Sequence, residues 1–215
     1  TGLWHEQVHH GERSMAGEAA RLEDSEAIER VLAGESDVFA VLLDRYRDHV
    51  LRIVTGRVPP PSVEETVHEV FVRAFRSLGR FAGRSPFSHW LASIAVRTCH
   101  DFWRKRYRDR EVPLGDLSRE HERWLEKTMA EDADLFHESG QAGREAAEIL
   151  DIVLSRMSPE DRTVIELVHL DGYSVSEASE LTGWSQAKVK IRAFRARKKM
   201  RKMIENIADR QGGLI

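Results

Sequence analysis

The chain has 215 residues, of which 41% are hydrophobic and 32% are charged, and its formal net charge is −3. This composition is typical of a globular protein with one or two domains. No apolar run reaches the roughly 18 residues that a membrane span requires, and the single cysteine, Cys99, cannot form an internal disulfide. Because the N-terminal stretch also lacks a signal-peptide core, we expect a reducing, cytoplasmic setting, with residues 1–14 preceding a possible start at Met15.

Charge is strongly segregated along the chain. Residues 97–110 carry six arginines and lysines against two acids, and residues 175–202 carry nine against two. Residues 1–48 and 111–151 are acidic, with eleven acids to five bases and twelve acids to four bases. Two basic blocks separated by acidic ones predict two surfaces that bind a polyanion, although a solvated helix face would explain either block alone.

The apolar spacing is helical almost throughout, which predicts an all-α fold without strands. Asp24 is expected to cap a helix over 25–33 that ends at Gly34. A second helix is expected over 37–55, before the rigid proline run at 59–61.

The next helix is predicted to begin at Ser62, which forms a capping-box pattern with Glu65. Its expected buried stripe follows spacings of three and four residues. The stripe consists of Val63, Val67, Val70, Phe71, Ala74, Phe75 and Leu78.

A fourth helix is predicted after the glycine-containing loop at 79–84. Ser85 is expected to be its N-cap, with Pro86 as the first helical residue. The helix runs directly into the first basic block. Its expected apolar face consists of Phe87, Trp90, Leu91, Ile94, Ala95, Thr98 and Phe102.

The C-terminal unit is predicted to contain a helix-turn-helix. Ser174 and Glu177 match a capping box, and Gly183 fits the left-handed position that ends a helix. Ser185 can then cap a second helix, which in this motif enters the DNA major groove and is called the recognition helix. The alternative is a structural helical hairpin with a basic surface.

Several side chains of the recognition helix are candidates for contacts with DNA. Glutamine and arginine can read base edges, while lysine mainly neutralises phosphates. The candidate residues are Ser185, Gln186, Lys188, Lys190, Arg192 and Arg195.

Both halves of the chain resemble extracytoplasmic-function (ECF) sigma factors, the minimal two-domain members of the bacterial sigma family. Residues 35–110 are similar to the family's domain two and residues 145–205 to its domain four, in the family's order. The resemblance implies a transcription initiation factor that binds core RNA polymerase at a β′ coiled coil and at the β flap. It also implies recognition of promoter −35 and −10 elements, DNA melting, and restraint by an anti-sigma factor.

The resemblance assigns roles to two further sets of residues. The acidic helix after Ser62 is implied to dock on polymerase through Glu64, Glu65, His68 and Glu69, where His68 replaces the family's usual glutamine. The loop and the fourth helix are implied to capture the −10 element, with aromatic rings stacking on bases and cations holding phosphates. The residues are Phe81, Arg84, Arg97, Trp103, Arg104, Lys105 and Arg106.

The domain boundaries follow from these assignments. We expect a flexible extension over 1–20, a first domain over 21–110, an acidic linker over 111–143, a helix-turn-helix domain over 144–207, and a tail over 208–215.

No catalytic constellation, Walker loop or metal-ligand cluster is apparent, so we expect neither an enzyme nor a cofactor. The histidines His5, His9 and His10 have ligand-like spacing but lie in a polar segment. The main rival is a helix-turn-helix regulator that acts without being a polymerase subunit, and a more distant one is a helical enzyme or metal sensor that uses the histidines.

Overall fold

Helices make up nearly all the regular structure of the residues described in this computed structural model, 23–109 and 149–212, and no strand occurs among them. The all-α prediction is confirmed for these residues. Contacts divide the chain into two compact units between Cys99 and His100, and each unit is described by itself. None of the helices in the described part combines the length and apolarity that crossing a bilayer needs. The predicted linker and the histidines at 5, 9 and 10 lie outside the described residues.

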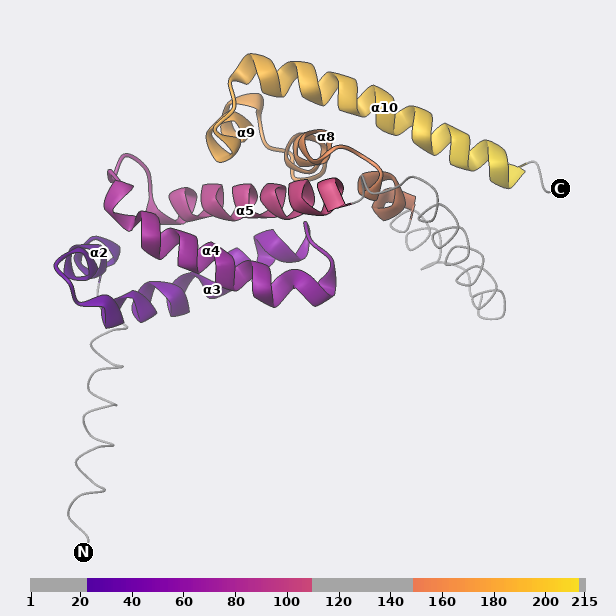
Figure 1. The fold of residues 1–215 in the computed structure, drawn as a ribbon. Helices are drawn as coiled ribbons and strands as arrows, with labels where there is room; N and C mark the ends of the chain where they lie inside the picture. Colours follow the sequence, from indigo (N-terminus) through magenta and orange to yellow (C-terminus); the bar gives the residue numbers. More distant parts are fainter. Residues whose placement is uncertain (1–22, 110–148, 213–215) are drawn as a thin grey trace, which may run out of the picture. The chain divides into compact units, whose positions relative to one another are not determined.

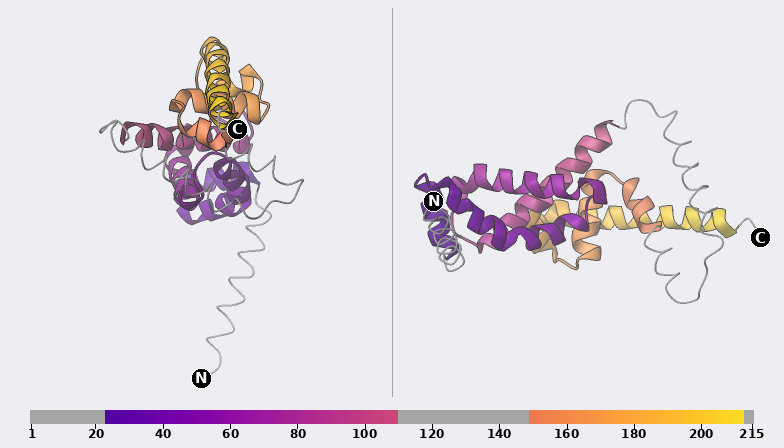
Figure 2. Two further views of the ribbon diagram at one scale, coloured as in Figure 1. Left: turned by 90° about the vertical axis from the view of Figure 1, so that its right-hand side faces the viewer. Right: turned by 90° about the horizontal axis from the view of Figure 1, so that it is seen from below.

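The first unit is built from α2 (Asp24–Leu32), α3 (Phe39–Thr55), α4 (Val63–Ser77) and the beginning of α5 (Phe87–Asp109). A 3-10 turn at Ser36–Val38 leads into α3, so the predicted helix over 37–55 is confirmed with a tighter first turn. The helices α3 and α4 lie side by side (Figures 1 and 2).

The core of the first unit follows the predicted apolar stripes closely. Phe75 is the exception, since its side chain is 43% exposed and contacts the Phe39 ring edge-to-face at 5.1 Å. The fully buried side chains include Leu42, Val50, Val54, Val70, Ala74, Leu78, Leu91 and Ala95.

The helix α2 is held to α3 by the side chain of Asp24. The prediction that Asp24 caps this helix is wrong, because Glu23 has the extended backbone of an N-cap and Asp24 is already helical. The Asp24 carboxylate instead accepts hydrogen bonds from Tyr46 and Arg45. Burial and this carboxylate raise the pKa of the Tyr46 hydroxyl to about 12.

The start of α4 differs from the predicted capping box. Pro60–Ser62 forms a 3-10 turn, so Ser62 already has helical dihedrals and its side chain makes no cap hydrogen bond. A capping side chain needs an extended backbone, which the preceding prolines do not leave at this position. The Ser62 carbonyl accepts a hydrogen bond from the Thr66 hydroxyl at 2.7 Å instead.

The start of α5 lies one residue later than predicted. Phe87 is its first helical residue, and the carbonyl of Pro86 accepts from the amides of His89 and Trp90 at 3.1 and 3.2 Å. Pro86 therefore occupies the N-cap position that was predicted for Ser85.

The second unit contains a helix over 149–155, α8 (Pro159–Val164), a π-helical segment (Ile165–Leu170), α9 (Val175–Thr182) and α10 (Gln186–Gly212). The long single helix α10 is clear in Figure 1 and in the right panel of Figure 2. Its core is closed by buried side chains from three of these elements, namely Val153, Leu154, Met157, Val164, Ile165, Ala193 and Ala196.

Candidate nucleic-acid interface

The helix-turn-helix is set by local capping at each of its ends. The Ser174 hydroxyl accepts from the Glu177 amide at 3.2 Å, and the Glu177 carboxylate accepts from the Ser174 amide at 2.8 Å. Gly183 has φ +76°, which ends α9 in the left-handed conformation. The Ser185 hydroxyl accepts from the Lys188 amide at 3.2 Å. The predicted capping box, turn glycine and second cap are all confirmed.

The buried and exposed positions of α10 alternate with helical periodicity. Val189, Ala193 and Ala196 are buried, at spacings of four and three residues, and pack the helix onto its unit. Most of the predicted DNA-contacting residues are exposed, which keeps them available to a ligand. They are Ser185, Gln186, Lys188, Lys190 and Arg195.

Two of these exposed side chains have contacts near the turn. The Gln186 amide donates to the Ser176 hydroxyl at 3.2 Å. The Lys188 ammonium lies 4.1 Å from the centroid of the Trp184 ring. Both contacts hold polar groups at the N-terminal end of α10, where a recognition helix meets bases and phosphates.

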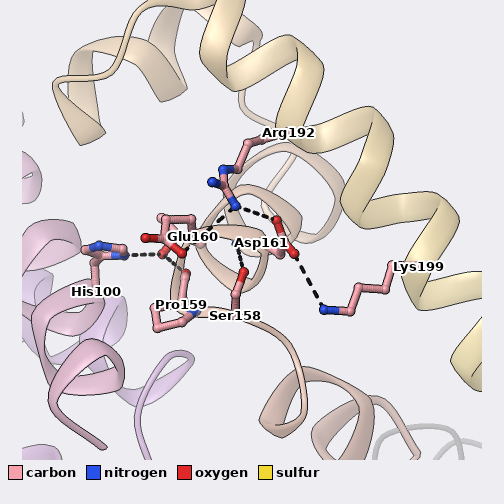
Figure 3. Close-up of polar contacts among 8 residues, drawn as sticks. His100, Ser158, Pro159, Glu160, Asp161, Arg192 and Lys199 are labelled. Atoms are coloured by element: carbon pink, nitrogen blue, oxygen red, sulfur yellow. Dashed lines mark hydrogen bonds and ion pairs between the residues drawn. The ribbon is translucent and has the colours of Figure 1, made fainter. Parts of the chain in front are cut away.

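Arg192 is arranged differently from the other predicted readers. Its guanidinium donates to the Asp161 carboxylate at 3.0 Å and lies 4.0 Å from Glu160 (Figure 3). Lys199 approaches the other Asp161 oxygen at 3.8 Å. Asp161 also donates its amide to Ser158, the predicted and confirmed N-cap of α8. Arg192 therefore lies on the flank of α10 that faces α8.

The predicted −10 residues fall into a packed set and an exposed set. The Phe81 ring packs against Phe87 and Trp90, with centroid distances of 5.6 and 5.2 Å, and Phe87 also contacts Tyr46 at 5.3 Å. Phe81 is half-buried in this aromatic cluster. Because four rings share the cluster, it positions the loop after α4 against the start of α5.

The cationic members of the −10 set are solvent-exposed along α5 and its preceding loop. Arg97 donates to the Ser93 hydroxyl at 2.8 Å, and Arg104 pairs with Asp101 at 3.3 Å. Trp103 is half-buried and contacts the Phe102 ring edge-to-face at 5.3 Å. The exposed cations of the set are Arg84, Arg97, Arg104, Lys105 and Arg106.

The acidic residues of α4 lie opposite its buried stripe. Glu64, Glu65 and His68 are exposed, while Glu69 is half-buried and accepts from Arg73 Nε at 2.7 Å. Glu64 lies 3.5 Å from Arg47 of α3. The arrangement leaves an acidic, solvent-facing surface on one side of α4.

A buried ion pair in α8 was not expected from the sequence. Arg162 Nε donates to the Glu166 carboxylate at 2.6 Å, and their side chains are 8% and 7% exposed. The spacing of four residues is a recognisable signal for a helical pair, but only the fold buries it.

Comparison with known proteins matches both halves of the chain to sigma factor domains. Residues 42–109 match the sequence model of sigma-70 region 2, and residues 147–200 match that of sigma-70 region 4. The ECF RNA polymerase sigma-E factor of Haemophilus influenzae is 31% identical over 189 residues, covering 87% of this chain and 96% of the relative. The chain belongs to the ECF sigma factor family.

Other relatives of this sigma factor agree. The ECF RNA polymerase sigma-E factor of Escherichia coli K12 is 31% identical over 202 residues, covering 88% of this chain and 98% of the relative. The solved structure of CnrH in complex with the cytosolic domain of CnrY has a TM-score of 0.50 and 22% identity, over 84% of this chain and 96% of that one. This second likeness concerns the fold.

Membership of the family settles the predicted function class. A sigma factor directs core RNA polymerase to promoters and is a non-enzymatic initiation factor. The predictions of a sigma factor and of a non-enzyme are confirmed, and the rival of a regulator that acts apart from polymerase is not favoured.

Proposed function

We propose that this sigma factor divides its contacts among three surfaces. The acidic surface of α4 binds the β′ coiled coil of core polymerase. The exposed cations of α5 and its loop hold the −10 element, and the N-terminal part of α10 enters the major groove of the −35 element. The observation that carries this proposal is that nearly all the charged candidates are solvent-exposed on the faces opposite the two cores.

The −10 surface combines two kinds of contact. Arg84, Lys105 and Arg106 would neutralise phosphates, because they are exposed and belong to the loop and the basic end of α5. Trp103 offers a ring for base stacking, whereas Phe81 supports the loop from within the aromatic cluster. Melting would thus depend on the end of α5 more than on Phe81.

Regulation and domain limits belong to the same proposal. An anti-sigma factor would cover the α4 and α10 surfaces and so block both polymerase and DNA. The domains would span 21–110 and 144–207, with a linker over 111–143, and the matches to regions 2 and 4 fall almost entirely within these limits. The protein would act in the cytoplasm, where its polymerase is found.

Run-off transcription with purified core polymerase tests the proposal. Replacing Glu64 and Glu65 together by lysine should weaken core binding at least ten-fold and abolish promoter-specific transcripts. The matched control replaces Glu26 and Glu29, which are exposed acids of α2, by lysine and should leave both readouts unchanged. Equal effects of the two charge reversals, at unchanged circular dichroism, would remove α4 as the docking surface.

A further inference from the structure

The outermost face of the recognition helix is apolar. Ile191 and Phe194 have side chains that are 52% and 65% exposed, and Ala187 precedes them on the same face at a spacing of four residues. At 3.6 residues per turn, this face lies opposite the buried line of Val189 and Ala193. We call these three residues, Ala187, Ile191 and Phe194, the apolar stripe.

Cations border the apolar stripe on both sides. Lys188 and Arg195 lie along one edge and Lys190 and Arg197 along the other, each pair separated by seven residues, or about two turns. All four are exposed, and no acidic residue occurs in α10 before Glu205. The face therefore consists of an apolar centre between two cationic margins.

This cross-section matches the major groove of DNA. The two phosphate backbones form the walls of a groove about 12 Å wide, and the base edges form its floor. Cations on both flanks of a helix face the two walls, while its central line faces the bases. The thymine C5-methyl is the apolar group on that floor, and aliphatic and aromatic side chains contact it.

We propose that Ile191 and Phe194 read thymine methyl groups, so that the upstream promoter element of this sigma factor requires A·T pairs at the positions they face. The inference rests on the proposed entry of α10 into the major groove and adds the base class that it recognises. Arg192 does not lie on this central line, because its guanidinium is paired with Asp161 at 3.0 Å on the flank. Specificity at the centre of the element then comes from apolar contacts.

The test uses holoenzyme assembled from the full chain and core polymerase. Upstream elements are first selected from a randomised library, and each selected thymine is then replaced by deoxyuridine, which removes only the methyl group. At fixed salt, we expect about four-fold weaker binding at one or two thymines, the loss that corresponds to one buried methyl group. Replacing selected cytosines by 5-methylcytosine gives the reverse probe.

The protein variants assign the effect to named side chains. In Ile191→Ala and Phe194→Ala, singly and together, deoxyuridine should no longer weaken binding at the corresponding position. The matched control is Ile204→Ala, an apolar residue 38% exposed on the same helix and about 15 Å beyond Phe194, which should keep the full sensitivity. Because all three side chains are exposed, unchanged circular dichroism verifies that each variant is folded.

Three outcomes separate the inference from the function beneath it. Equal binding to thymine and deoxyuridine elements, while Lys188→Ala and Arg195→Ala still weaken binding, overturns the reading of methyl groups and leaves α10 as the DNA helix. Loss of core assembly in the stripe variants, with unchanged base preference, makes the stripe a protein-binding surface and also overturns it. No effect of any of these substitutions on promoter binding would remove α10 from the −35 contact altogether.

Discussion

Arg192 of α10 donates a hydrogen bond to Asp161 of α8 across 3.0 Å, and this contact joins the recognition helix to the first turn of a helix 31 residues earlier. Asp161 is mostly buried, with 16% of its side chain exposed, and Lys199 lies 3.8 Å from its second oxygen. Two cations of α10 thus converge on one carboxylate (Figure 3). The contact fixes which face of α10 is turned outward.

The first prediction concerns this pair. Arg192 is 38% exposed, so solvent screens the contact and Arg192→Ala should lower the free energy of unfolding by about 0.5–1 kcal/mol. Base preference at the −35 element should stay unchanged. Urea unfolding of the single and double variants with Asp161→Ala measures the coupling. A loss of guanine preference at one position in Arg192→Ala would instead show that Arg192 reads a base, as the sequence predicts.

The second prediction compares two glycines that end helices. Gly183 ends α9 with φ +76°, whereas Gly56 ends α3 with φ −76°. Gly183→Ala should destabilise the helix-turn-helix by about 1–2 kcal/mol, because a Cβ is strained in the left-handed region. Gly56→Ala meets no atom within 4 Å and should be neutral or stabilising by about 0.4–1 kcal/mol. Thermal or urea unfolding measures both, and equal effects would contradict the backbone explanation.

The third prediction concerns alkaline pH. The pKa of Tyr46 is raised from 10.0 to about 12, mainly by burial and then by its hydrogen bond to Asp24. A pKa that is higher in the folded chain stabilises it fully below pH 10, and the contribution is lost as the pH rises toward 12. Tyrosinate absorbance of the parent chain minus that of Tyr46→Phe should titrate near 12. A midpoint near 10 while the chain is folded would refute the contact with Asp24.

The fourth prediction concerns the buried pair of Arg162 and Glu166. Removing one partner leaves a charge in the core, so Arg162→Leu and Glu166→Leu should each cost about 3–5 kcal/mol. The double replacement by leucine should recover most of that loss, because neither charge is then buried alone. Urea unfolding of the full chain checks the order of stability, and a double variant less stable than both single ones would contradict it.

Local chemistry determined much of this fold. The caps at Ser158, Ser174 and Ser185 and the left-handed turn at Gly183 involve residues within a few positions of one another, so the sequence alone predicts them. Ser62 matches the same pattern but fails, because the neighbouring prolines force a 3-10 turn at that point. A short motif is therefore predictive only where its flanking backbone is compatible.

Contacts between distant segments decided the rest. The sequence identified α10 as basic and helical, and it grouped Arg192 with the other candidate readers. Only the fold brings Asp161 beside Arg192 and leaves Ile191 and Phe194 on the outer face. The physical reason is that helical periodicity shows which residues share a face, whereas the direction of each face depends on what the rest of the chain packs against it.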